Sequence, residues 1–173
     1  MKKFLGAIVS GLAGVLSLVF LAIPAFVFDG GALGKEKVSG WKILTDKAWG
    51  EADMTAVTWY RIFAWILVVL AVILIIVAVL QLLSSLGVVK MPAIIDTVAK
   101  YALIALAVVS ILALIANFGI RSEMIDPAKD AGLKGDALKA YKDMYSVGAS
   151  LWVVAIVNTI AAVCGNLFGK AKD

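Results

Sequence analysis

The sequence contains no histidine and only one cysteine among its 173 residues. Without histidine, the chain lacks the commonest metal ligand in proteins and the commonest general base at neutral pH. Cys164 cannot form an internal disulfide, and no histidine is present to activate its thiol. The glycines form no phosphate-binding loop, because no Gly-Lys-Ser/Thr follows them. The sequence therefore predicts a non-enzymatic protein with no catalytic residue, metal site or cofactor.

Charge is scarce as well. Charged residues make up 16% of the chain and are absent from four blocks of 20 or more residues, at 4–28, 62–89, 101–120 and 144–169. About 20 helical residues cross the hydrocarbon core of a bilayer. The blocks do not alternate apolar with polar residues, as the strands of a membrane barrel would. These blocks predict an all-α integral membrane protein, a bundle of four transmembrane helices.

Sorting the chain by these blocks divides one membrane domain, 1–173, into seven segments. We expect transmembrane helices at about 4–28, 59–86, 101–120 and 144–169, outer loops at 29–58 and 121–143, and an inner connector at 87–100. The first block is longer than the 7–15 apolar residues of a typical signal peptide, so we expect it to stay as a helix. In the connector, apolar residues at helical spacing predict an amphipathic helix start at the inner interface, with Asp96 and Lys100 as an i,i+4 pair.

The net charge of +4 lies entirely in three short segments: the N-terminus, the connector and the C-terminal tail. Six lysines and two aspartates occupy these segments, whereas 29–61 and 121–143 hold ten basic and ten acidic residues. Basic residues in short loops favour the cytoplasmic side. We therefore expect an N-in/C-in topology with two extracytoplasmic loops. The lysines are explained by anionic lipid headgroups, and no nucleic acid is expected as a partner.

Small residues recur at helical spacing in three of the predicted helices. The candidate packing residues are Gly6, Ser10, Gly14, Ala64, Ala71, Ala78, Ala161, Gly165 and Gly169. A stripe without bulky side chains lets another helix backbone approach closely. Two interpretations remain open: packing inside the bundle, or contacts between chains through the first helix.

Polar residues within the blocks are the natural candidates for a transport function. They are Ser17, Gln81, Ser110, Asn158, Thr159 and Asn166, and none of them is ionisable. Matching their depths brings Ser17, Ser110, Asn158 and Thr159 to the middle of the membrane. They either join the helices by hydrogen bonds or line a permeation path.

The outer loops carry the candidate partner contacts Trp41, Trp49, Trp59 and Arg61. Trp41 and Trp49 either lie on lipid headgroups or form a recognition surface. The first loop is long enough for a hairpin or a short helix. In the second loop, Asp126-Pro127 is typical of a helix start, and the residues from Asp136 onward predict a helix that continues into the fourth span.

The predicted architecture has a longer first outer loop, a shorter second one and inner termini. In outline it resembles the claudin family of four-helix proteins. Trp41, Trp49-Gly50 and Arg61 carry that resemblance, while the paired loop cysteines of claudins are absent. We expect a structural, interaction or accessory subunit that acts through its outer loops and helix faces, with lipids and either other membrane proteins or further copies as partners. The alternative is a small transporter or channel subunit whose pore forms on oligomerisation. Met1-Lys2-Lys3 and the short loops indicate a multi-pass protein of a bacterial plasma membrane.

Overall fold

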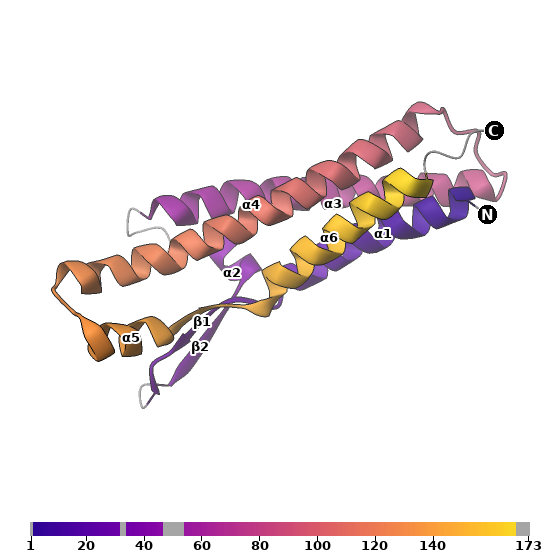
Figure 1. Ribbon diagram of the computed structural model, residues 1–173. Coiled ribbons are helices and arrows are strands. Elements are labelled where there is room, and N and C mark those ends of the chain that lie inside the picture. Colours follow the sequence, from indigo (N-terminus) through magenta and orange to yellow (C-terminus); the bar gives the residue numbers. More distant parts are fainter. Residues whose placement is uncertain (1, 32–33, 47–53, 169–173) are drawn as a thin grey trace.

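The computed structural model describes residues 2–31, 34–46 and 54–168, with side chains from 4 to 166 (Figure 1). In these ranges the elements follow in the order α1 (Lys2–Leu21), β1 (Pro24–Asp29), β2 (Lys35–Ser39), α2 (Gly40–Thr45), α3 (Thr55–Ser85), α4 (Ile94–Asp130), α5 (Gly135–Asp143), β3 (Tyr145–Val147) and α6 (Ala149–Phe168). The prediction of four long apolar helices is confirmed, because α1, α3, α4 and α6 are each long and apolar enough to cross a membrane.

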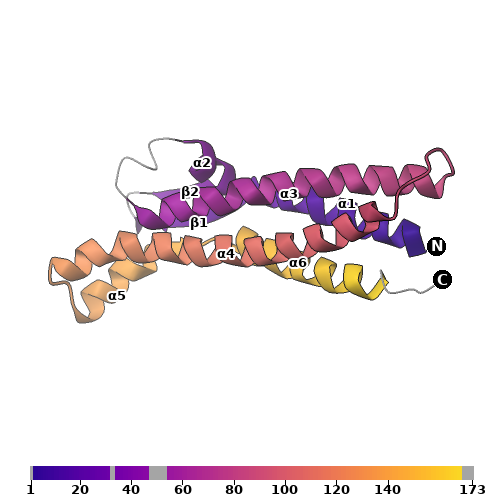
Figure 2. The same ribbon diagram turned by 90° about the horizontal axis from the view of Figure 1, so that it is seen from above.

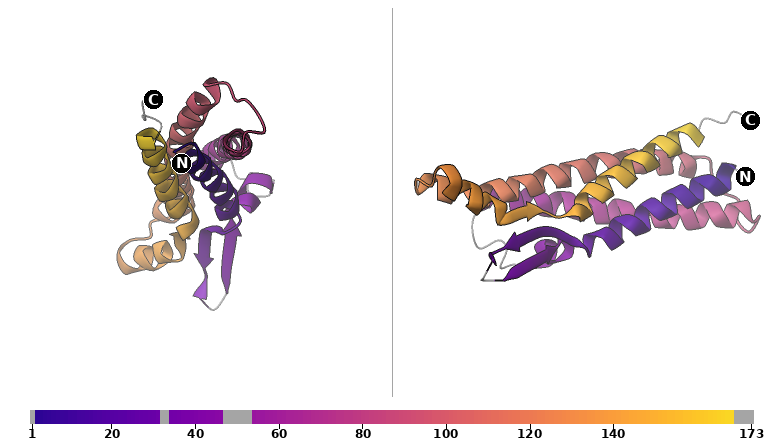
Figure 3. Two further views of the ribbon diagram at one scale, coloured as in Figure 1. Left: turned by 90° about the vertical axis from the view of Figure 1, so that its right-hand side faces the viewer. Right: turned by 60° about the horizontal axis from the view of Figure 1, so that its bottom comes forward.

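The four long helices form a ring in which α1 packs on α3, α3 on α4, α4 on α6 and α6 on α1 (Figure 2). Both chain ends lie at one end of this bundle, which we call the termini end (Figure 1). The strands, α2 and α5 lie at the other end, which we call the sheet end. Figure 3 shows the four helices viewed along the bundle from the termini end.

Helix α3 shows why the helices pack in this way. Its buried side chains recur in steps of three and four residues: Val57, Tyr60, Ala64, Leu67, Ala71, Leu74, Ala78 and Gln81. This spacing puts one continuous stripe of the helix against its neighbours at a small crossing angle. The remaining faces of α3 are apolar and exposed, as expected for a helix whose surroundings are also apolar.

The small residues of α1 point into the bundle. Ser10 and Gly14 are buried, and a Cβ atom built on Gly14 would lie 2.7 Å from the Ala71 carbonyl oxygen of α3. On α6, a Cβ at Gly165 would lie 2.6 Å from Leu103 of α4. Ala64, Ala71, Ala78 and Ala161 are buried too, whereas Gly6 is half-buried with nothing within 4 Å of its Cβ position. Gly169 lies outside the described residues.

The expectation of an all-α protein is confirmed only in part: the described chain is mostly helical, but three strands form a small antiparallel sheet in the order β2-β1-β3. Phe26 pairs with Val38 of β2 on one side and with Val147 of β3 on the other. Helix α1 ends at Leu21 and not at residue 28, and Pro24 begins β1. Proline has no N–H to donate, so the first residue of a strand is one of the few positions that it tolerates in a sheet.

The hairpin and the short helix that the sequence left open for the first outer loop both form, as β1–β2 and α2, but β1 lies almost entirely before that loop, at the end of the first apolar block. Two predictions for the second loop are wrong. Pro127 lies inside α4 and does not begin a helix, and α5 is separated from α6 by β3. Helix α4 also extends ten residues past its apolar block. This extension contains the good helix formers Arg121, Glu123, Met124, Ala128 and Lys129.

The buried side chains gather in two clusters. One joins the sheet to the bundle and contains Phe26, Ile43, Tyr60, Ile120 and Leu151. The other lies nearer the termini end and contains Leu21, Leu67, Leu74, Leu106 and Val154. The sheet is therefore part of a core that it shares with the helices, and its position relative to the bundle is fixed.

Candidate functional site

The sheet meets the bundle at two consecutive carbonyl groups, those of Pro24 and Ala25. The Ala25 oxygen accepts from the Gly148 N–H at 2.7 Å and from the Asn117 side-chain amide, also at 2.7 Å. The Pro24 oxygen accepts from the Ser150 hydroxyl at 3.0 Å. Three donors thus bind the first two residues of β1: the Asn117 side chain of α4, the Gly148 N–H just before α6 and the Ser150 hydroxyl in its first turn. Buried carbonyl groups left without donors would be costly, and here both are satisfied.

Gly148 makes this junction possible. A Cβ atom at this position would lie 2.0 Å from the Pro24 oxygen, so no other residue fits without moving the backbone. The last strand residue, Val147, and the first residue of α6, Ala149, flank it. The chain therefore passes directly from the sheet into the helix at the closest approach of β1 and α6.

Arg61 attaches α2 to α3. Its Nε donates to the Ile43 oxygen at 2.9 Å, and its Nη2 donates to the Asp46 oxygen, at the C-terminal end of α2. At the other end of α2, the Ser39 hydroxyl accepts from the Lys42 N–H, as an N-cap. Carbonyl groups at a helix C-terminus carry partial negative charge, which favours the guanidinium there.

Trp41 attaches α2 to α1. Its indole N–H donates to the Leu18 oxygen at 3.3 Å, and its ring packs against both core clusters. It is half-buried between elements of the same chain. Trp59 is 51% exposed and stacks on Phe63 with ring centroids 5.8 Å apart. Trp49 lies outside the described residues.

Two charged residues of α4 hold the remaining elements. Arg121 donates from Nε to the Tyr145 oxygen at 2.7 Å and from Nη2 to the Lys142 oxygen at 3.1 Å, which fixes β3 and the end of α5. Glu123 accepts from the Ala56 N–H at 3.1 Å, in the first turn of α3. That helix has no side-chain cap of its own, so the carboxylate of a neighbouring helix provides one.

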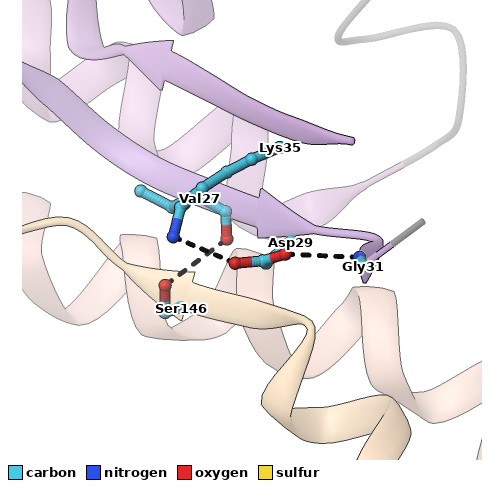
Figure 4. Close-up of polar contacts among 5 residues, drawn as sticks. All are labelled: Val27, Asp29, Gly31, Lys35 and Ser146. Carbon is cyan, nitrogen blue, oxygen red and sulfur yellow. Dashed lines mark hydrogen bonds and ion pairs between the residues drawn. The ribbon is translucent and has the colours of Figure 1, made fainter. Parts of the chain in front are cut away.

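One face of the sheet is polar and exposed (Figure 4). Lys35 and Asp29, directly paired across β1 and β2, form an ion pair at 3.0 Å. Ser146 donates to the Val27 oxygen at 3.5 Å from the neighbouring strand. The hydrogen bond from Lys35, aided by the Gly31 N–H, holds the pKa of Asp29 below its ordinary value of 3.8. This face presents charge and backbone edges to water.

The opposite face of the sheet is aromatic. The ring of Tyr145 lies 5.2 Å from that of Phe28 and 5.3 Å from that of Tyr141, and the two tyrosine hydroxyls are 3.2 Å apart. Burial, together with the hydrogen bond to Tyr141, raises the pKa of Tyr145 to about 12. These rings connect the sheet with α5, whose side chains are otherwise half-buried or exposed.

In the middle of the bundle, Asn158 of α6 bonds to two other helices. Its side-chain nitrogen lies 3.0 Å from the Ser17 hydroxyl of α1 and 2.7 Å from the Ser110 hydroxyl of α4. Its oxygen lies 3.1 Å from Ser17, and Ser110 also donates to the Leu106 carbonyl at 2.6 Å. All three side chains are at most 1% exposed.

The other polar residues predicted within the helices do not join this cluster. Thr159 and Asn166 bond to carbonyl groups of their own helix, those of Ala155 and Ala162. Gln81 donates to the Asp96 carboxylate at 2.9 Å, near the termini end. Of the four residues that the sequence places at mid-depth, the structure brings Ser17, Ser110 and Asn158 together, whereas Thr159 is exposed.

Sequence reasoning missed the residues of the sheet junction: Asn117 as a bond to the sheet, Arg121, Glu123, Gly148 and Ser150. The signal available was weak, since it consisted of polar or small residues at the edges of apolar blocks.

Within the ranges that the structure describes, no three His, Cys, Asp or Glu side chains gather closely enough to hold a metal ion. No family model, curated protein or solved structure matches this chain.

Proposed function

We propose that this chain is a non-enzymatic membrane protein that positions a small folded platform outside the membrane for contact with another molecule. We use the term platform for the sheet, α2 and α5. Helices α1, α3, α4 and α6 would cross the bilayer, with the termini end in the cytoplasm and the sheet end outside. A bacterial plasma membrane is the location that the sequence favours.

The observation that carries the proposal is the way in which the platform is attached. Side chains from α3 and α4 donate to backbone carbonyl groups of α2, β1, α5 and β3. Loops that only connect helices need no such bonds and usually lie loosely on the surface. A folded platform fixed to the helices keeps its outer face in one geometry, which lowers the entropic cost of binding a partner.

The position of the aromatic rings supports the membrane assignment. Trp59, Phe118 and Trp152 are exposed near the sheet end of their helices, and Phe118 packs edge-on against Trp152 at 5.7 Å. Along α3, the 22 steps from Trp59 to Gln81 span about 33 Å at 1.5 Å per residue. That length matches the hydrocarbon core of a bilayer, and aromatic rings favour its edges.

The transport alternative has less support. The polar groups at mid-depth bond to one another, and Thr159, which would extend them into a path, points outward. Asn158→Ala in proteoliposomes addresses this alternative directly. A change in ion or solute flux relative to the unaltered chain would favour transport over the platform function.

Photocrosslinking in cells tests the platform function. A photoreactive amino acid at Lys37, exposed on the sheet, should give a defined adduct with a second macromolecule. The same amino acid at Val108, exposed on the flank of α4, should give lipid adducts only. If neither Lys37 nor Ser146 yields an adduct at any expression level, the platform is not a binding surface.

A further inference from the structure

The connector between α3 and α4 carries the most exposed large hydrophobic side chains in the described part of the chain. They are Leu86 at 72%, Val88 at 68% and Ile94 at 66% exposed. These residues lie beyond the Gln81–Asp96 hydrogen bond, at the very end of the bundle. A cluster of this kind, facing water, would be an aggregation hazard, so another apolar phase is expected to cover it.

The connector holds these side chains outward by a defined turn. Gly87 has a φ of +75°, its N–H donates to the Ser84 oxygen at 3.1 Å, and the Val88 N–H donates to the Leu83 oxygen at 3.0 Å. These two bonds form a Schellman motif, which ends α3 and satisfies its last carbonyl groups. In this motif the residue at the Val88 position normally packs back onto the helix, yet Val88 remains largely exposed. The turn therefore presents Val88 to its surroundings.

Among the described residues, Lys90 and Lys100 form no ion pair. The sequence pairs Lys100 with Asp96, but in the structure Asp96 accepts from Gln81, and the ion pairs of the described residues all lie in the platform or at the outer end of α4. Lys90, at the tip of the connector, is exposed, and Lys100 is half-buried one turn after Asp96. Two lysines without an ion pair in the described residues thus lie close in sequence to the apolar residues.

We propose that the α3–α4 connector is a membrane-surface element that inserts Leu86, Val88 and Ile94 into the cytoplasmic leaflet and binds anionic phospholipid headgroups through Lys90 and Lys100. Exposed apolar side chains also occur on the adjoining helix flanks, at Val79 of α3 and at Val98 and Tyr101 of α4. Lipid that covers those flanks therefore reaches the connector. Basic residues beside an apolar insertion are the pattern that anionic bilayer surfaces attract.

This inference rests on the membrane placement proposed above, and a labelling experiment separates the two. In a C164S background, a polarity-sensitive fluorophore is attached at V88C, V69C or E36C in liposomes with nitroxide-labelled lipids. Val69 lies on the flank of α3 and Glu36 on the platform. We expect lipid quenching at V69C and V88C but not at E36C. Quenching at V69C alone overturns the connector proposal, and no quenching at V69C overturns the membrane placement itself.

Headgroup binding is tested on the full chain by titrating phosphatidylglycerol into delipidated protein and counting bound lipids by native mass spectrometry. Each surface lysine is expected to change the affinity about fivefold, so K90Q and K100Q together should weaken binding by more than tenfold. The matched control, K37Q with K139Q, removes two exposed platform lysines and should leave the affinity for phosphatidylglycerol unchanged. Equal affinities of the two double variants, or equal binding of phosphatidylcholine, would overturn the headgroup assignment. A V88C probe shielded from water but not quenched by lipid would indicate a protein partner instead.

Discussion

At the scale of single residues, the junction at Pro24 and Ala25 combines three hydrogen bonds with the close approach of Gly148 to the backbone of β1. Two adjacent carbonyl groups accept from three donors that lie in distant parts of the sequence. The two side-chain donors, Asn117 and Ser150, can be altered separately, which makes the junction suitable for measuring what holds the sheet to the helices.

Gly148→Ala should destabilise the protein by about 2–4 kcal/mol, because the new methyl group must displace the backbone of β1. SDS titration in mixed micelles measures the free energy of unfolding. Gly6→Ala is the matched control, since its Cβ position is empty, and it should be neutral or slightly stabilising. Equal effects of the two substitutions would contradict the close approach of β1 and α6.

Asn158→Ala removes hydrogen bonds to two helices and should cost about 1–2 kcal/mol, near the upper end of the values for such bonds in membranes. Thr159→Ala, one residue further on, removes only a bond within its own helix and should change stability by less than about 0.5 kcal/mol. The same titration compares them. A larger loss for the Thr159 variant would be inconsistent with the orientation of α6.

The Asp29–Lys35 pair predicts a pH dependence of the hairpin. Because the pKa of Asp29 is lowered in the folded chain, the contribution of the pair is fully present above the ordinary pKa of 3.8 and is lost as pH falls through the lowered value. Lys35→Gln should raise the pKa of Asp29 toward 3.8, as followed by NMR of its side-chain carboxyl carbon. An unchanged titration midpoint in the variant would show that the pair does not form in solution.

At the scale of elements, two arginines, Arg61 and Arg121, hold the platform by donating to backbone carbonyl groups. Arg121→Gln should free the segment from Lys142 to Tyr145, because the shorter glutamine side chain cannot donate to the carbonyl oxygens of both residues. Hydrogen exchange at the β3 amides should accelerate at least tenfold, while exchange in α2, which Arg61 holds, should be unaffected. Acceleration spread over both elements would indicate global unfolding instead.

The sequence predicted the apolar helices well and the platform poorly, for one physical reason. A transmembrane helix is specified by about 20 local residues, whose lack of charge is visible without any tertiary information. A strand of three residues, such as Tyr145–Val147, forms only because β1 lies beside it. Likewise, Pro127 resembles a helix start in isolation, but it lies in the last turn of α4, and the helix ends three residues after it.

At the scale of the whole molecule, the proposed topology makes a direct prediction about sides. In a C164S background, a cysteine at K37C should react with an impermeant maleimide added outside intact cells, whereas one at K90C should react only after permeabilisation. Both lysines are exposed, so reactivity reports the side of the membrane and not burial. The reverse pattern would invert the orientation without altering the fold.

The order of the strands also bears on how the chain is made. Strand β1 pairs with β2 a few residues later, but its second partner, β3, is preceded by α3, α4 and α5. The hairpin can therefore form early in synthesis, while the β3 side of β1 stays open until Tyr145–Val147 have left the ribosome. A chain truncated before Tyr145 would expose that open edge, so quality-control proteases should recognise unfinished copies there and spare completed ones.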